Sequence, residues 1–262
     1  MNRREFIPGI LGAAGLLIPS NGLGRYLSGT PISQEPKSIH TWLTPPRSDN
    51  YACDVDIRIN RFPVAPDKRW LYYLSLQVNF TGHDEWSHGG IQWAGAKEFR
   101  DNNNKGINWG GGSDWAGYGG IGSTNTPFTW ETGKWYRFRA WRLDKNEEGL
   151  YQWLFAVMDR ASGVEKQYGK VVTKSEYIKN AVVFTETGYG VSCGTETVDV
   201  EWRDPVFRHP GGTSGPDTGT ATYNGTCDGA NSTQQGLISR NPLQWFHATN
   251  TRRTVAHNSR LW

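Results

Sequence analysis

Short runs in which apolar and polar residues alternate are the feature that most constrains the fold of this chain. Residues 53–59 read Cys-Asp-Val-Asp-Ile-Arg-Ile, and residues 74–80 read Leu-Ser-Leu-Gln-Val-Asn-Phe. Side chains of a β-strand point to opposite faces in turn, so this period of two predicts strands with one buried and one polar face. Four later runs follow the same pattern: 135–143, 151–157, 181–185 and 198–202.

Turn residues separate these runs, and after the N-terminal segment the only sign of helix is a single turn at Ser175–Asn180. Many short strands with one polar face each are typical of two sheets packed face to face. We therefore predict an all-β protein: a two-sheet antiparallel β-sandwich of the jelly-roll kind.

The N-terminal segment resembles a bacterial twin-arginine export signal. Residues 2–18 (NRREFIPGILGAAGLLI) contain an arginine pair, an aromatic-aliphatic pair after one spacer, and a modest apolar run. About a dozen apolar residues are too few to cross a hydrocarbon core of roughly 30 Å. We expect residues 1–30 to be the export signal and the start of a linker, with cleavage between residues 22 and 32. The expected location is the periplasm or the exterior, with no membrane contact after cleavage.

The rest of the chain divides by composition. We expect the sandwich over residues 31–208 and a Gly/Pro/Thr-rich linker over 209–222 (HPGGTSGPDTGTAT). Residues 223–262 are too few to fold alone, so we expect them to pack back on the sandwich, with Trp245 among the anchors.

The chain has three cysteines, Cys53, Cys193 and Cys227, so one intramolecular disulfide at most is expected. We favour Cys193–Cys227, because that bond would attach the C-terminal segment to the sandwich. Three unpaired cysteines remain the alternative.

Charge and motifs exclude several functions. The net charge is +3. Without the charged residues of 1–30 it falls to about +1, so nucleic acid is not an expected partner. The sequence contains no phosphate-binding loop, no Gly-x-Ser-x-Gly and no Cys-x-x-Cys. Nucleotide chemistry and serine hydrolysis are therefore unsupported, and the oligomeric state is not predicted.

Thirteen tryptophans are spread along the chain, and several aromatic residues lie in the Gly-rich segment 107–122 (INWGGGSDWAGYGGIG). Exposed rings beside carboxylates and amides suit a polyhydroxylated ligand, so a polysaccharide is the expected partner. Rings folded inward over the sandwich edge are the alternative. The candidate ligand-binding residues are Trp109, Asp114, Trp115 and Tyr118, with Trp93 and Trp141 on a polar strand face.

Two carboxylates could serve a glycoside hydrolase. Asp199 and Glu201 share one face of a strand and lie about 6.5–7 Å apart along it. That spacing suits a pair of catalytic carboxylates. Ion pairs with Arg203 and Arg137 are the simpler interpretation, and the same reservation applies to Glu186.

A lyase would instead need a base near an amide or cationic group, for which His88, Gln92, Tyr118 and Arg139 are the candidates. His88 belongs to Gly82–Gly90 (GHDEWSHGG), which we interpret as a solvated loop. Zinc or calcium there is a weaker alternative. No cofactor is expected, although a structural calcium ion stays open.

Three aromatic motifs carry a resemblance to a family of exported bacterial domains of unknown function. They are Gly89–Gln92 (GGIQ), Asn108–Gly111 (NWGG) and Trp130–Phe138 (WETGKWYRF). The resemblance extends over roughly residues 50–208. It implies a concanavalin-like jelly roll found in secreted proteins, often in carbohydrate-related contexts, and it implies no reaction.

Three hypotheses follow. The leading one is an exported, non-catalytic carbohydrate-binding sandwich that uses the aromatic residues of the Gly-rich segment. The second is a polysaccharide-degrading enzyme, either a hydrolase or a lyase, on the same fold. The third is a structural protein of the cell envelope whose aromatic residues all lie in the core.

Overall fold

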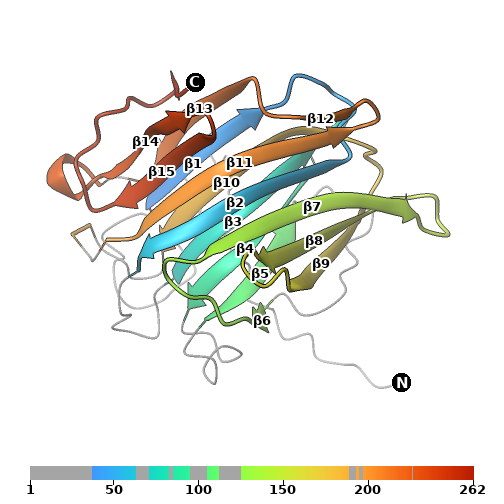
Figure 1. Ribbon diagram of the computed structural model, residues 1–262, viewed down its shortest axis with the longest axis horizontal. Coiled ribbons are helices and arrows are strands. Elements are labelled where there is room, and N and C mark those ends of the chain that lie inside the picture. The colour runs from blue at the N-terminus through green and yellow to red at the C-terminus, as the bar shows by residue number, and fades with distance from the viewer. Residues whose placement is uncertain are drawn as a thin grey trace, which may run out of the picture.

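The computed structural model describes residues 37–62, 71–82, 85–94, 105–111, 125–188, 193–194, 197–225 and 227–262. Two antiparallel sheets are stacked face to face, and the strands of one cross in front of the other (Figure 1). Besides strands, these residues form one 3-10 turn, η2 (Gly229–Asn231). The predicted all-β sandwich is therefore confirmed. No helix in the described part of the chain is long and apolar enough to cross a membrane.

Sheet A has the strand order β16-β13-β1-β10-β3-β4-β5-β6, so neighbours in space are often far apart in sequence. Its strands are β1 (Lys37–Thr44), β3 (Leu71–Phe80), β4 (Trp86–Ala94), β5 (Lys105–Gly111), β6 (Asn125–Pro127), β10 (Ile178–Gly188), β13 (Thr218–Asn224) and β16 (Ser259–Arg260).

Sheet B has the order β14-β15-β11-β2-β7-β8-β9, and β12 pairs with β11. Its strands are β2 (Ala52–Arg61), β7 (Trp135–Lys145), β8 (Tyr151–Asp159), β9 (Glu165–Thr173), β11 (Asp199–His209), β12 (Gly212–Ser214), β14 (Thr233–Arg240) and β15 (Leu243–Thr249).

The core lies between the sheets and follows the alternation of the sequence. Val55 and Ile57 of β2 and Leu74 and Leu76 of β3 all point inward and are fully buried. Large rings fill the remaining space, since the fully buried side chains include Trp130, Trp153, Trp202 and Trp245. Several of the tryptophans therefore serve packing rather than ligand binding.

One polar cluster interrupts this core and joins the two sheets. His247 of β15 lies 2.8 Å from the hydroxyl of Thr41 in β1 and 3.1 Å from that of Thr185 in β10. The Thr41 hydroxyl also donates to Gln235 over 2.6 Å. Burial, and then the charge of His40, hold the pKa of His247 well below its ordinary 6.5. The buried ring is therefore neutral and hydrogen-bonded on both nitrogens.

The outer face of sheet B is covered by ion pairs. Asp56 of β2 is fully buried, and its carboxylate lies 2.6 Å from Arg137, 3.2 Å from Arg160 and 3.6 Å from Arg203. Asp54 is enclosed in the same way by Arg139 and Arg208. The polar face of β2 is therefore sealed by guanidinium groups rather than left open to water.

The C-terminal residues complete both sheets. The interval 209–222, which has the composition of a linker, contains β12 and most of β13. Its threonines alternate with Gly219 and Ala221, and this alternation makes part of it a strand that pairs with β1 on one side and with β16 on the other. Strands β14 and β15 then extend sheet B, and the Trp262 ring lies 5.1 Å from that of Trp245. Residues 223–262 thus pack on the sandwich as expected.

The single helical turn expected at Ser175–Asn180 is wrong. The chain bends there, and β10 begins at Ile178, whose N–H donates to the carbonyl oxygen of Asn50. Gly82–Gly90 is also different from the expected loop, because β4 begins at Trp86.

Candidate functional site

The outer face of sheet A, which faces away from the core, gathers polar and aromatic side chains from β1, β10, β3 and β4. The register places Ser38, Glu186, Tyr73 and Gln92 in one row across these four strands. Neighbouring strands lie about 4.8 Å apart, so directly opposite side chains on this face are within reach of one another.

Small residues in the next row create room for rings. Ser75 lies opposite Gly90, and neither fills the space above the sheet. The rings of Tyr73, Phe184 and His88 pack over them, with centroids 5.4 Å apart for Tyr73–His88 and 5.5 Å for Tyr73–Phe184. All three side chains are buried, so they form a layer outside the main core.

Glu186 is the carboxylate of this face. It is partly buried, and burial raises the pKa of its side chain from 4.5 to about 7. On the neighbouring strands it lies opposite Ser38 and Tyr73. A carboxyl group with such a pKa exchanges protons near neutral pH.

The two histidines of the face are neutral at physiological pH. Burial lowers the pKa of His88 to about 3. Burial, and then the charge of His257, lower the pKa of His40 to about 4. The Nδ1 atom of His88 is buried and has no hydrogen-bond partner among the described residues.

A row of amides continues the face beyond the rings. Gln77 Nε2 donates to Asn79 Oδ1 over 2.8 Å, and Asn79 Nδ2 donates to Asn180 Oδ1 over 2.6 Å. Trp86 lies opposite Asn79 on β4 and stacks on His88 with ring centroids 5.3 Å apart.

The predicted carboxylate pair does share one face, but on sheet B. Glu201 accepts hydrogen bonds from Arg58 over 2.8 Å and from Asn60 over 2.7 Å. Burial acts to raise its pKa, but these hydrogen bonds and the Arg58 charge outweigh it and lower the pKa. Burial raises the pKa of Asp199. Both carboxylates lie on the opposite side of the sandwich from His88, so the three catalytic candidates do not meet in one site.

The predicted ligand-binding aromatic residues are only partly described. Asp114, Trp115 and Tyr118 lie outside the described residues, and for Trp109 the structure describes only its place in β5, opposite Gly89. Trp93 points into the core, where its ring lies 4.8 Å from Phe62 and 5.9 Å from Tyr72. The expectation of a ligand-facing Trp93 is wrong, because the inward positions of β4 are the odd-numbered ones.

Of the other candidates, Gln92 lies on the outer face of sheet A, whereas Arg139 and Trp141 lie on that of sheet B. The Arg139 guanidinium lies 5.1 Å above the Trp141 ring and bonds to Glu165 over 2.5 Å. These two residues are therefore separated from His88 by the core.

The cysteines pair as expected, with a disulfide between Cys193 and Cys227 whose Cα atoms are 5.5 Å apart. Cys53 is a buried free thiol.

Within the described ranges, no group of three or more His, Cys, Asp or Glu side chains is arranged to hold a metal ion. In the segment Gly82–Gly90, where a metal ion was the weaker alternative, Glu85 is buried and accepts a hydrogen bond from Ser175 over 2.9 Å.

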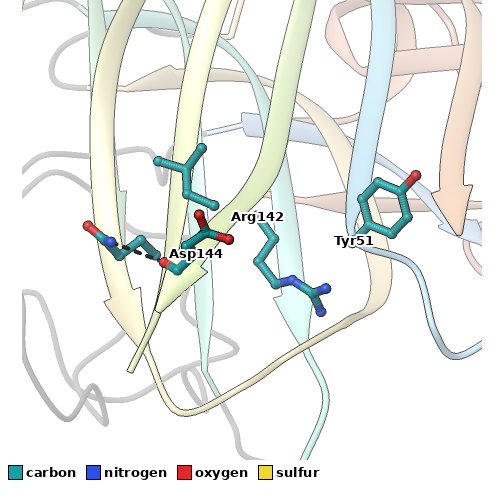
Figure 2. Close-up of a pocket in the computed structure, with 5 residues that line it drawn as sticks. Tyr51, Arg142 and Asp144 are labelled. Atoms are coloured by element: carbon teal, nitrogen blue, oxygen red, sulfur yellow. Dashed lines mark hydrogen bonds between the residues drawn. The ribbon is translucent and has the colours of Figure 1, made fainter. Parts of the chain in front are cut away.

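A shallow pocket of about 640 Å³ lies at one end of the sandwich. It is lined by Tyr51, Arg142, Leu143, Asp144 and Gln152 (Figure 2). The Arg142 guanidinium lies between 5.2 and 5.9 Å from the rings of Tyr51, Tyr151 and Tyr177, and it donates to the carbonyl oxygen of Glu176 over 2.8 Å. These contacts show that Arg142 links the ends of several strands, so its guanidinium group is already engaged within the protein.

Among solved structures the chain is similar in fold to two crystal structures of scytalido-glutamic peptidase, one with a peptide-based transition state analogue and one with a transition state analogue inhibitor. It is also similar to SCP-B, a member of the eqolisin family of peptidases, in a complex with the tripeptide Ala-Ile-His.

The identities are 10%, 10% and 9%, and the TM-scores are 0.45, 0.45 and 0.44. Each comparison covers 82% of this chain and 98% of the other. No family model matches the chain, and no curated protein matches it.

Sequence reasoning missed the row that contains Glu186. Glu186 was considered as a carboxylate candidate, but its neighbours could not be identified. Ser38 and Tyr73 are brought to it by strands that are distant in the sequence. The sequence did contain one signal: uncharged polar residues repeat on one face of a strand, as Ser75, Gln77 and Asn79 do.

Proposed function

We propose that the protein binds a polysaccharide on the outer face of sheet A and cleaves it there, with Glu186 transferring a proton at the glycosidic linkage. The observation that carries this proposal is the row in which Glu186 lies opposite Ser38 and Tyr73, with Gln92 on the next strand. A carboxyl group and an amide, both partly exposed, thus lie in one row with two buried hydroxyl groups.

The position of Glu186 favours catalysis over a structural role. General acid-base catalysis is most effective when the pKa of the group lies near the working pH, and burial brings Glu186 to about 7. Glu201 is less suited to proton transfer, because its salt bridge with Arg58 at 2.8 Å keeps its carboxylate ionised and engaged with the guanidinium group.

The surrounding residues favour a glycan as the substrate. Sugar rings have apolar faces and hydroxyl edges, and they bind where aromatic rings lie beside amides. Trp42 and Trp86 are partly exposed at two sides of the face, and the indole N–H of Trp42 is bound to Thr222 over 2.9 Å, which orients its ring. Between them lie the amides of Asn79, which is partly exposed, and of Gln77, which is buried.

We further propose that the protein works outside the cytoplasm. The signal-like residues 2–18 and the Cys193–Cys227 disulfide support this, because disulfides persist mainly in oxidising compartments. An extracellular location is also where polysaccharide substrates are found.

The test is to incubate the protein with plant, algal and bacterial polysaccharides and to follow new reducing ends. Ultraviolet absorbance of unsaturated sugar ends distinguishes elimination from hydrolysis. We expect Glu186→Gln to lower kcat by about 100-fold or more, as loss of a general acid-base group does, while polymer retention persists. Glu201→Gln on the opposite face is the matched control and should keep the wild-type rate.

Product formation at the wild-type rate by Glu186→Gln would exclude the assigned role. Retention of a polysaccharide without any product would instead favour the non-catalytic binding protein. Release of peptides from casein, with no product from any glycan, would replace the substrate class by protein.

A further inference from the structure

We propose that Trp42 of β1 and the outward threonines of β13 form a sugar subsite that leads an extended, β-linked chain of pyranose rings to Glu186. This inference rests on the proposed function, because it extends the same ligand along the same face. It adds the residues that hold the chain away from the reacting linkage, the path of the chain over the sheet, and the kind of linkage that this path accepts.

The exposure of the outer face of sheet A decides the path. The middle of the face is covered, since Val182 and Phe184 of β10 are 1% and 2% exposed and Ser75 of β3 is fully buried. The outward positions of β1 and β13 differ from it. Those that are partly exposed or exposed are His40, Trp42, Thr218, Thr220, Thr222 and Asn224. A ligand therefore lies over β1 and β13 and reaches Glu186 from that side.

Trp42 is an aromatic platform whose position is fixed by the fold. Its ring packs against the buried layer formed by Tyr73, Val182 and Phe184. Its indole N–H donates to the Thr222 hydroxyl over 2.9 Å, and the ring remains partly exposed. A ring held in this way loses little freedom when a ligand binds, and its face suits the apolar face of a sugar.

Hydroxyl groups lie beside this ring. Thr220 is directly opposite Trp42 on β13, and Thr222 is the next outward residue of that strand. The Thr222 oxygen accepts the indole N–H, so its own O–H is left to donate to a ligand. Among the described residues, the side chains of Thr220 and Asn224 have no hydrogen-bond partner. These groups both donate and accept, as the hydroxyl groups of a sugar do.

The platform and the carboxyl group are too far apart for one sugar ring. Trp42 lies four residues from Ser38 on β1, and Ser38 is opposite Glu186. At about 3.3 Å per residue, the indole lies roughly 13 Å from Glu186 along the strands and one strand spacing of about 4.8 Å across them. A ligand that touches both must therefore be a chain of several rings.

The straightness of the path selects the linkage of that chain. Thr220, Thr222 and Asn224 are alternate residues of one strand, so they face the same side and follow one line. Sugars joined by equatorial β linkages form an extended chain whose ring faces are C–H surfaces, whereas α-linked glucose curls into a helix. The extended chain can rest on Trp42 and continue along β1 to Glu186. We therefore expect a β-linked glucan or xylan.

The experiment measures affinity by isothermal titration calorimetry on the full chain in the Glu186→Gln background, which we expect to bind the ligand without cleaving it. The probes are cellohexaose and xylohexaose, with maltohexaose as the α-linked chain and cellobiose as the short one. The variants are Trp42→Ala, which removes the ring, and Thr220→Val, which keeps the shape of the side chain and removes only the hydroxyl group.

The matched controls lie on the outer face of sheet B. They are Trp135→Ala, at a partly exposed tryptophan, and Thr213→Val, at an exposed threonine. Thermal unfolding of each variant shows whether the fold is kept. Because Trp42 also packs on the buried layer, Thr220→Val keeps the test decisive if Trp42→Ala fails to fold.

We expect cellohexaose or xylohexaose to bind more tightly than maltohexaose and cellobiose. Trp42→Ala should weaken binding of that hexasaccharide by about tenfold, because an aromatic contact is lost. Thr220→Val should weaken it by about fivefold, because one hydrogen bond is lost. Both sheet B controls should keep the affinity of the background protein.

Unchanged hexasaccharide affinity in folded Thr220→Val or folded Trp42→Ala would overturn the inference. So would maltohexaose bound as tightly as cellohexaose and xylohexaose, or no hexasaccharide bound at all. Failure of the proposed function has a different signature: Glu186→Gln forms product at the wild-type rate, or the wild type forms none, while Trp42→Ala and Thr220→Val still weaken binding.

Discussion

The backbone of Gly219 lies against the indole ring of Trp262, so closely that a Cβ atom at position 219 would come within 2.3 Å of the ring. We predict that Gly219→Ala lowers the free energy of unfolding by about 1–3 kcal/mol, because the ring must leave its place against Trp245. Chemical denaturation measures this. Gly215→Ala is the control, since its nearest atom is at 3.9 Å and its stability should stay near that of the wild type.

The pKa of Glu186 makes stability depend on pH in a direction opposite to that of most carboxylates. Burial raises the pKa from 4.5 in the unfolded chain to about 7 in the fold. The folded state therefore binds more protons between these values, and this group costs stability as the pH rises through that window. We predict that Glu186→Gln is more stable than the wild type at pH 8, by up to about 3 kcal/mol, and equal to it below the unfolded pKa.

Urea unfolding at both pH values measures this difference. The histidines with lowered pKa values titrate alike in both proteins, so the comparison isolates Glu186. A difference that is the same at both pH values would show that the substitution acts through packing rather than through protonation.

The carboxylate of Asp56 is fully buried among Arg137, Arg160 and Arg203. Removing one partner of a buried ionic cluster leaves uncompensated charge, so we predict that Asp56→Ala costs about 3–5 kcal/mol of stability. Thermal and urea unfolding measure the loss. Asp49→Ala, which breaks the exposed pair with Arg47, should change stability very little, and an equal loss in both variants would contradict the argument.

The disulfide Cys193–Cys227 closes a loop with a sequence separation of 34. Loop-closure entropy predicts that the double variant Cys193→Ser, Cys227→Ser is less stable by about 3–4 kcal/mol. A reducing agent should lower the melting temperature of the wild type and leave that of the double variant unchanged. If both proteins respond equally to the reductant, the effect does not come from this disulfide.

Local alternation was sufficient to predict the strands and the inward residues. Val55 and Ile57 are buried because a period of two places them on one face whatever the neighbouring strand is. The same argument correctly placed Asp199 and Glu201 on one face. It could not identify their partner, because Arg58 is brought to Glu201 from a strand 143 residues away.

The candidate site depended even more on pairing. Glu186, Tyr73 and Gln92 are adjacent only because sheet A has the order β10-β3-β4, and this order is not encoded in any local pattern. Composition was misleading at 209–222, where glycine and threonine are typical of a linker but alternate in a way that suits a β-strand. The protonation behaviour of Glu186 likewise arises from burial by distant residues.

The strands β13 to β16 have a consequence for biosynthesis. They form the edge of both sheets, and Trp262 is buried against Trp245. While a ribosome still holds these residues in its exit tunnel, β1 and β11 each lack a neighbour and expose unpaired backbone groups. The two sheets therefore gain these outer strands only once β13 and β15 have left the tunnel, and until then the edges of β1 and β11 are free to pair with another chain.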